Sequence, residues 1–195
     1  MFAPKFAPAP VTLTGEVVRL EPLAEHHAPG LLEAGADERI WTWMPRGPLE
    51  DREDALAWIR EARAAERQVP FAMVELASGR AVGSTRYLDV RVADRGLEIG
   101  WTWLAPSAWR TAVNTETKLL LLTQAFEGWG AERVQLKTDA RNDRSMRAIE
   151  RLGAVHEGVL RRHMRVRGGV LRDTVMYSIL ADEWPAARER LRGGS

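Results

Sequence analysis

A turn of six residues, Trp109 to Asn114, lies between an apolar strand pattern and an apolar helix pattern, and its chemistry suits an anion. The first N–H groups of a helix have no partner within the helix, and the helix dipole attracts negative charge to them. A phosphate is therefore a suitable ligand, and Arg110 can add a charge-assisted contact. Glu116 would repel that anion, so we expect its side chain to point away. An ordinary turn capped by Asn114 fits the same spacing, and both interpretations stay open at this point.

Glu98 is the only carboxylate within the strand pattern Leu97 to Leu104. Because side chains alternate along a strand, Glu98 must face away from Leu97 and Ile99. If its face lines a substrate groove, the carboxylate can accept a proton through water. A solvated strand glutamate is the alternative.

These residues need a scaffold, and the hydrophobic periodicity supplies one. The expected strands span residues 11–20, 71–76, 81–88, 97–104, 133–138, 155–166 and 170–180, with hairpin turns at Ser78-Gly79 and Gly168-Gly169. The expected helices span residues 24–34, 51–67, 114–129 and 143–152, with a last helix capped by Asp182. Residues 40–45 are expected to form an aromatic linker and residues 106–111 a loop. This order predicts an α/β protein with a largely antiparallel sheet.

The composition is that of a globular chain. With 195 residues, 45% of them apolar, a sizeable core is available to a single domain, which we expect over residues 11–192. Residues 1–10, which include three prolines, are expected to form an extended arm. The 28 basic and 27 acidic residues nearly cancel, so a nucleic-acid partner is not expected.

The chain contains no cysteine, which excludes a disulfide, a thiolate metal site and a cysteine nucleophile. The four histidines show no metal-ligand spacing, so no metal is expected. No apolar run approaches the length of a membrane span, and no signal-peptide pattern opens the chain. We therefore expect a cytoplasmic protein without a membrane partner.

Several motifs occur in a recognisable order in the second half of the chain. They are Leu97-Glu98-Ile99-Gly100-Trp101-Thr102-Trp103-Leu104, Trp109, Glu116, Asn142-Asp143-Arg144-Ser145, Arg151-Leu152-Gly153-Ala154, Glu157-Gly158-Val159-Leu160-Arg161, and Arg172-Asp173 before Tyr177-Ser178. Each motif alone is weak, but the ordered set resembles the GNAT superfamily of N-acetyltransferases, in particular the RimJ/RimL-like branch. The resemblance extends over nearly the whole chain.

The resemblance implies a GNAT-like fold of the α/β (α+β) class. This fold is a mixed, mostly antiparallel sheet of about seven strands flanked by helices, with splayed central strands that bind acetyl-CoA. The implied reaction transfers the acetyl group of acetyl-CoA, the co-substrate, to a primary amine by direct attack. The acceptor would be a protein N-terminal α-amine or a small-molecule amine. A backbone N–H within Trp101 to Leu104 would meet the oxyanion.

The turn Trp109 to Asn114 departs from the phosphate-loop pattern of the family. In that pattern the first residue is usually Gln or Arg, the fourth is Gly, and the sixth is Gly or Ala. Trp109, Ala112 and Asn114 occupy those three positions. The loop still suits the pyrophosphate if the amides of Ala112 to Thr115 point at it. The implied cofactor-binding residues are Trp103, Leu104, Arg110, Thr111, Ala112, Val113, Asn114, Thr115, Asn142 and Ser145.

The resemblance also implies roles in catalysis and acceptor binding. The catalytic candidates are Glu98 as base, Ser145 as donor to the departing sulfur and Tyr177 as acid for the thiolate. A helix N-cap at Asn142, an exposed Ser145 and a cross-strand pair of Tyr177 are the structural alternatives. The substrate-pocket candidates are Trp41, Trp43, Arg86, Glu98 and Trp101, although the tryptophans fit a core equally well.

Two other functions remain open. The missing glycines motivate a non-catalytic acyl-CoA-binding regulatory module. The basic segment Arg161 to Arg167 motivates an RNA-associated protein, although alternate strand positions point to opposite faces. A homodimer is also compatible with the sequence.

Overall fold

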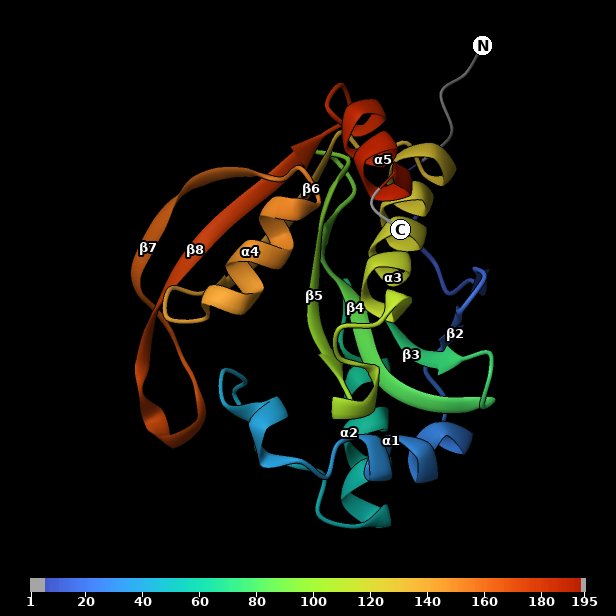
Figure 1. Ribbon diagram of the computed structural model, residues 1–195. Coiled ribbons are helices and arrows are strands. Elements are labelled where there is room, and N and C mark those ends of the chain that lie inside the picture. Colours follow the sequence, from blue (N-terminus) through green and yellow to red (C-terminus); the bar gives the residue numbers. More distant parts are fainter. Residues whose placement is uncertain (1–5, 194–195) are drawn as a thin grey trace.

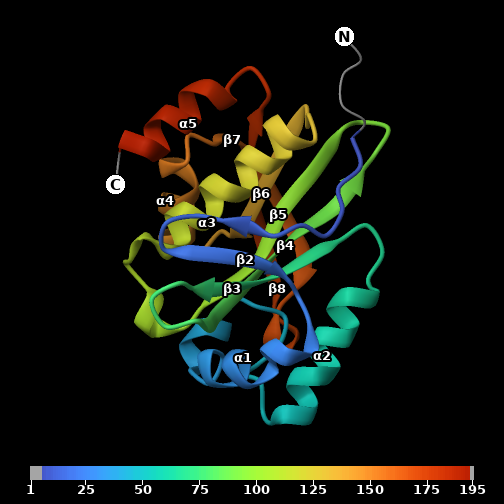
Figure 2. The same ribbon diagram turned by 90° about the vertical axis from the view of Figure 1, so that its right-hand side faces the viewer.

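The computed structural model describes residues 6–193 and shows one sheet of eight strands with helices on both faces (Figure 1 and Figure 2). The strands are β1 (Leu13–Thr14), β2 (Val18–Pro22), β3 (Val69–Glu75), β4 (Arg80–Arg91), β5 (Gly96–Leu104), β6 (Arg133–Asp139), β7 (Val155–Arg165) and β8 (Leu171–Leu180). Their order across the sheet is β1-β2-β3-β4-β5-β6-β8-β7. The expected fold class is thus confirmed.

The pairing of β5 with β6 is the exception in this sheet. All other neighbours are antiparallel, whereas β5 and β6 are parallel. Gly96 to Glu98 face Arg133 to Gln135, and the described chain has no later pair between the two strands. We call the point where they part, after Glu98 and Gln135, the fork; in Figure 1 the two halves of the sheet diverge downward from it. Beyond the fork, the N–H groups on the open edge of β5 have no strand partner.

The helices form two layers. They are α1 (Ala28–Ala34), α2 (Arg52–Ala64), α3 (Ala112–Thr123), α4 (Asp143–Arg151) and α5 (Trp184–Gly193). Phe71 and Met73 on β3 belong to the core that includes residues of α3 and α5, whereas Ala72 between them belongs to the core of α1 and α2. This alternation shows that the two cores lie on opposite faces of the sheet. Within residues 6–193, no helix has both the length and the apolar character needed to span a bilayer.

The ends of α1 and α2 follow the sequence signals. Gly35 terminates α1, as predicted. Asp51 caps α2 by accepting a hydrogen bond from the Asp54 N–H at 2.8 Å. Ala55 and Ile59 are fully buried along α2, so this face of the helix packs on the core. The 3₁₀ turn Glu38–Trp41 overlaps the start of the expected aromatic linker, residues 40–45, between the two helices.

The positions at which α3 and α4 begin determine the geometry of the site. The predicted start of α3 at Asn114 is wrong: the helix begins at Ala112, because the Thr111 hydroxyl accepts the Val113 N–H at 3.3 Å. Asn142 caps α4 by accepting the Ser145 N–H at 3.1 Å.

The N-terminal segment differs from the prediction. Residues 11–20 form the hairpin of β1 and β2 rather than one strand, which is why the sheet has eight strands. Phe6 is buried in the core, while residues 1–5 of the expected arm lie outside the described residues.

Glu116 on α3 fixes that hairpin. Its carboxylate accepts the N–H groups of Glu16 at 2.6 Å and of Val17 and Val18 at 2.8 Å. The Glu116 carboxylate is thereby committed to the β1–β2 turn. A side chain at Gly15 would overlap this carboxylate, so the turn requires glycine for close approach.

This packing predicts that the effects of Glu116 and Gly15 substitutions on the free energy of unfolding do not add. Glu116→Ala leaves three N–H groups without their acceptor and should cost about 1.5–3 kcal/mol of unfolding free energy. Gly15→Ala should also destabilise, because its Cβ meets the carboxylate. The double variant should be no less stable than Glu116→Ala alone, because the obstacle is gone. Urea unfolding of the four proteins measures the coupling, and additive losses would refute this account of Gly15.

Candidate active site

Glu98 lies at the fork and is buried, with 2% of its surface exposed. Its carboxylate forms an ion pair with Nζ of Lys137 at 2.9 Å and accepts a hydrogen bond from Nε2 of Gln135 at 3.1 Å. It faces away from Leu97 and Ile99, as alternation predicted, and the alternative of a solvated glutamate is wrong. A buried carboxylate, in contact with a lysine, thus lies where the sheet opens.

Two further basic residues lie near this ion pair. Arg172 on β8 is 8% exposed, and burial lowers its pKa against the raising effect of Asp139 and Glu98. The pKa of His163 is lowered by burial first, and then by the positive charges of Lys137 and Arg172. Sequence reasoning missed Lys137, Arg172 and His163 as site residues; the alternation of Lys137 with buried Leu136 and Thr138 was the available signal.

Beyond the fork, β5 contains a bulge. Ser84 pairs with Trp103 and Arg86 pairs with Gly100, so Trp101 and Thr102 together oppose Thr85. Trp101 has φ +49°, a left-handed conformation that is strained for a tryptophan. The bulge removes backbone groups near Trp101 from the hydrogen bonds between β5 and β4. The other edge of β5 is already open beyond the fork.

The bulge is held from both faces. On one side the Arg86 guanidinium lies 4.7 Å from the ring centre of Trp101. On the other side Nζ of Lys118 on α3 donates to Oγ1 of Thr102 at 2.7 Å, and that hydroxyl is 2.8 Å from the Thr85 hydroxyl. Lys118 is 7% exposed and has no ion-pair partner within residues 6–193, and burial lowers its pKa to about 7. Sequence reasoning missed Lys118, which stands alone within an apolar helix.

The turn before α3 retains free donors despite its lack of glycine. The Val113 N–H is used by the Thr111 cap, and helix geometry commits the Thr115 N–H to the Thr111 carbonyl. The N–H groups of Ala112 and Asn114 remain. Neither of these residues has a positive φ, so the backbone does not demand glycine at either position.

A surface cavity of about 480 Å³ lies beside this turn but does not suit a pyrophosphate. It is lined by Thr111 to Val113, the β1–β2 turn and the β3–β4 turn. Glu16 and Glu75 contribute carboxyl side chains to its lining, which disfavour an anion there. The flank of the turn toward α4 is more basic. There, Arg39 and Arg144 lie 5.3 and 4.6 Å from the ring centre of Trp109.

Tyr177 is not brought to Glu98. The two side chains are on opposite faces, because Glu98 pairs with Gln135 whereas Tyr177 pairs with the neighbouring Leu136. The Tyr177 hydroxyl donates to Glu150 of α4 at 3.1 Å, and burial raises its pKa. Its ring also packs edge-on against that of its cross-strand partner His156, with 5.5 Å between the ring centres, so the alternative of a cross-strand pair is confirmed.

The other expected residues divide between core and groove. Trp41 is fully buried and donates its indole N–H to the Gly35 carbonyl at 2.8 Å, so it packs the core instead of covering an acceptor. Trp103 and Leu104 are buried as well, which leaves only their backbone for a cofactor. Trp43 is partly exposed, and the Arg141 guanidinium lies 5.1 Å from the centre of its ring.

The linker that contains Trp43 contacts the β7–β8 hairpin. The Arg167 N–H donates to the Met44 carbonyl at 3.2 Å, and its guanidinium pairs with Glu38 at 2.5 Å. These contacts connect segments that flank the fork on opposite sides. They also show that the basic segment Arg161 to Arg167 serves partly as an internal contact.

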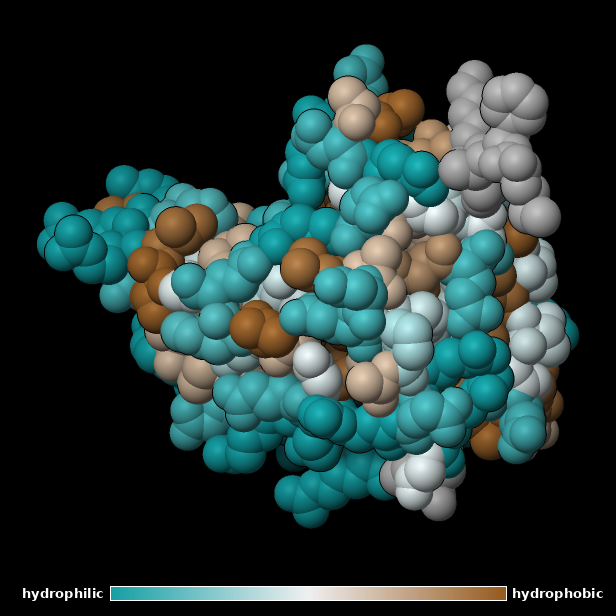
Figure 3. All heavy atoms as spheres, turned by 90° about the horizontal axis from the view of Figure 1, so that it is seen from above, coloured by the Kyte–Doolittle hydropathy of each residue, from teal (hydrophilic) through white to brown (hydrophobic). Residues whose placement is uncertain are grey.

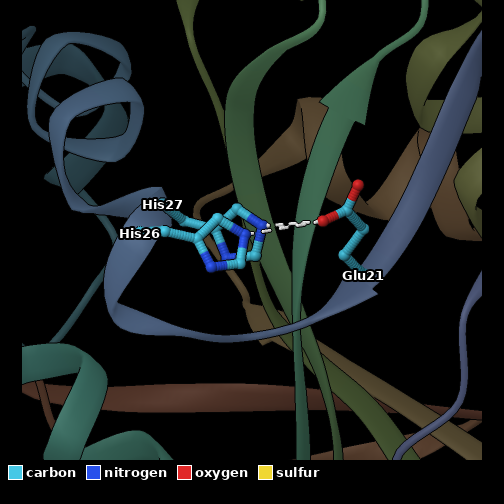
Figure 4. Close-up of side chains that lie close together, drawn as sticks. All are labelled: Glu21, His26 and His27. Carbon is cyan, nitrogen blue, oxygen red and sulfur yellow. Dashed lines mark hydrogen bonds and ion pairs between the residues drawn. The ribbon is translucent and has the colours of Figure 1, made fainter.

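One histidine pair lies apart from the fork, next to Glu21 on β2 (Figure 4). The Ala24 N–H donates to Nδ1 of His27 at 3.1 Å, so Nε2 carries the proton and donates to Glu21 at 3.1 Å. Both nitrogens of His27 are thereby occupied, which leaves no lone pair for a metal.

The outer edge of the sheet is exposed. Apolar side chains reach the surface on the side of the molecule where β7 and β8 lie (Figure 3). They include Val155, Val159 and Leu160 of β7, each between 45% and 50% exposed.

Comparisons with known proteins show the family and the fold. A family model described as an acetyltransferase (GNAT) domain matches residues 18–155. A GCN5-related N-acetyltransferase from Brucella melitensis is 31% identical and superposes with a TM-score of 0.92 over 98% of this chain and 88% of that one. RimJ from Mycobacterium smegmatis, solved with CoA-disulfide, shares the fold at 23% identity, with a TM-score of 0.81 over 99% of this chain and 97% of that one. A Bacillus subtilis protein provisionally named ribosomal N-acetyltransferase YdaF is 31% identical over 109 residues. That match covers 56% of this chain and 58% of the relative.

Burial of Lys118 predicts a pH-dependent stability. The folded pKa of about 7 is below the unfolded value near 10.5, so the unfolded chain binds more protons between these values. The cost of burying Lys118 is complete below pH 7 and is relieved as the pH rises toward 10.5. Lys118→Met should therefore be more stable than the parent at pH 7, on the order of a few kcal/mol, and the gain should shrink with rising pH.

Urea unfolding of parent and variant between pH 6.5 and about 10 measures this trend. Thr102→Val is the matched control, because it removes the hydrogen-bond partner of Lys118 but keeps the lysine and its pH slope. A stability difference between parent and Lys118→Met that does not change with pH would contradict the prediction.

Proposed function

The chain belongs to the GNAT acetyltransferase family, and from this premise we propose that it transfers the acetyl group of acetyl-CoA to a primary amine by direct attack. The acceptor is a protein N-terminal α-amine or a small-molecule amine. The observation that carries the proposal is the buried carboxylate of Glu98 at the fork, next to the open edge of β5.

The residues present fit acetyl-CoA as co-substrate. The free N–H groups at the start of α3 and the exposed Arg110 suit its pyrophosphate. The open edge of β5 supplies N–H donors for the amides of the pantetheine arm and for the thioester carbonyl. Acetyl-CoA supplies an activated acyl group, and β5 holds it beside Glu98.

Glu98 accepts the proton that the ammonium form of the acceptor must lose. The free amine then forms a C–N bond with the acetyl carbon, the C–S bond breaks, and a second proton of the amine goes to the departing sulfur, so that CoA leaves as the thiol. Lys137 and Gln135 hold the carboxylate in place for this task. An α-amine, with an ordinary pKa of about 8, needs this help less than a lysine amine at about 10.4.

Other assigned roles are narrower. Asn142 is engaged as the cap of α4, so we propose that it positions this helix rather than binding pantetheine. The Ser145 hydroxyl, one turn along, is proposed as the donor to the departing sulfur. Tyr177 is assigned no proton transfer, because its hydroxyl is bound to Glu150.

The role of the α3 N-terminus predicts a loss of acetyl-CoA affinity in Asn114→Glu. A carboxylate at this position repels the pyrophosphate, so the acetyl-CoA Kd should rise by at least about tenfold, or 1.4 kcal/mol. Asn114→Gln is the matched control and should bind nearly as the parent does. Calorimetry measures all three proteins, and equal affinities would place the phosphate site elsewhere.

The role of Glu98 predicts a change in the pH–rate profile. Glu98→Gln should keep the melting temperature and the acetyl-CoA affinity close to those of the parent, while kcat falls by roughly ten- to a thousandfold. The loss should shrink at high pH, where the amine deprotonates unaided.

Thiol release with one amine acceptor, followed across pH for parent and variant, tests this role. An acidic limb that is unchanged in Glu98→Gln would remove Glu98 from the mechanism. A variant that loses acetyl-CoA binding as well would point to a structural role.

A further inference from the structure

Arg86 on β4 is a buried cation without an anion. It is 5% exposed, and no carboxylate within residues 6–193 comes within ion-pair distance of it. One terminal nitrogen donates to Oε1 of Gln68 at 3.2 Å, and Nε has no acceptor. Burial lowers its pKa to about 10, although the distant Glu61 acts in the opposite direction. Burying a charge without a partner is costly, and an anion would relieve that cost.

Two tryptophans hold this guanidinium by its faces. The Arg86 guanidinium carbon lies 5.2 Å from the ring centre of Trp58 on α2 and 4.7 Å from that of Trp101 on the β5 bulge. Stacking fixes the orientation of a guanidinium but does not satisfy the N–H groups in its plane. Trp101 and Gln68 are partly exposed, so the guanidinium lies directly beneath the surface.

The same cluster contains other donors without acceptors. The indole N–H groups of Trp58 and Trp103 are buried and have no partner, and the two rings are 5.9 Å apart. Within the described chain, every buried side-chain polar atom that lacks a partner is a nitrogen donor, and three of the four belong to this cluster. What the cluster lacks is therefore an acceptor, and a carboxylate offers two acceptor oxygens.

The cluster is next to the proposed base. Arg86 pairs with Gly100 and Leu88 pairs with Glu98, so Arg86 and Glu98 lie on one face of the sheet, on alternate rungs about 7 Å apart. Gly100 lies between them, and the side chains of Glu98 and Leu88 close over its backbone, because a Cβ there would meet Oε1 of Glu98 and Cδ1 of Leu88 at 2.8 Å each. An acceptor that spans the distance between these two side chains can reach the cation with one end and the base with the other.

We propose that the acceptor is a small amino-carboxylate, such as a free amino acid, whose carboxylate pairs with Arg86 while its amine faces Glu98. The inference rests on the proposed function and names its acceptor class. Trp101 covers the bound carboxylate, and the strain of its backbone holds its ring over Arg86.

A comparison of acids with amides tests the proposal. Acetyl-CoA turnover is measured with the twenty amino acids and with the same amino acids as C-terminal amides. The parent should acetylate at least one acid, and Arg86→Met should lower kcat/KM for that acid by roughly ten- to a hundredfold, the effect of losing a bond to a charged group. The amide of the same amino acid should lose less than about threefold. Arg80→Met is the matched control, because Arg80 is an exposed arginine of the same strand, paired with Glu33.

Each outcome decides between roles. An equal loss for acid and amide in Arg86→Met would make Arg86 a structural cation and overturn the inference. Turnover by the parent of amines without a carboxylate, with no turnover of any amino acid, would overturn it while leaving the proposed function intact. No turnover of any amine would overturn the proposed function itself. If Arg86→Met does not fold, Arg86→Lys replaces it. The kcat/KM for the acid should then fall more than that for the amide, because lysine lacks the planar, stacked guanidinium donors.

Discussion

The separation of β5 from β6 after three paired residues is the constraint from which the rest of the site follows. Two parallel strands that stayed paired would use the N–H groups of β5 and close the sheet. Because they part, one edge of β5 is open, and Glu98 stands where the opening begins. A buried carboxylate at this place needs compensation, and β6 provides it through Lys137 and through Gln135, the pairing partner of Glu98.

The polar groups around the fork are mostly donors. Arg86, Lys118 and Arg172 are each less than 9% exposed, and burial lowers the pKa of all three. Against these cations stand few buried carboxylates. Such an excess of positive charge and N–H groups costs stability in the free protein, but it suits a reaction whose co-substrate carries phosphates and whose thioester oxygen gains negative charge. The Trp101 bulge is packed by Arg86 on one face and by Lys118, through Thr102, on the other.

Much of this arrangement was predictable where local patterns decide it. Alternation, for example, placed Glu98 away from Leu97 and Ile99. The rest depends on contacts between distant residues. The three N–H groups that bind Glu116 come from a hairpin about a hundred residues earlier, and that hairpin was predicted as one strand. Tyr177 turns to Glu150 of α4, and Trp41 turns to Gly35, choices that no periodicity reveals.

The most direct test of the account is a map of the backbone amides that acetyl-CoA perturbs, measured by nuclear magnetic resonance on the assigned protein. The open edge of β5 and the start of α3 should respond, so the amides of residues 100–104 and of Ala112 and Asn114 should shift on saturation. The amides of β2 and of the β3–β4 turn should stay in place. Shifts confined to the cavity lined by Glu16 and Glu75, with residues 100–104 unchanged, would contradict the claim that the fork holds the acetyl donor.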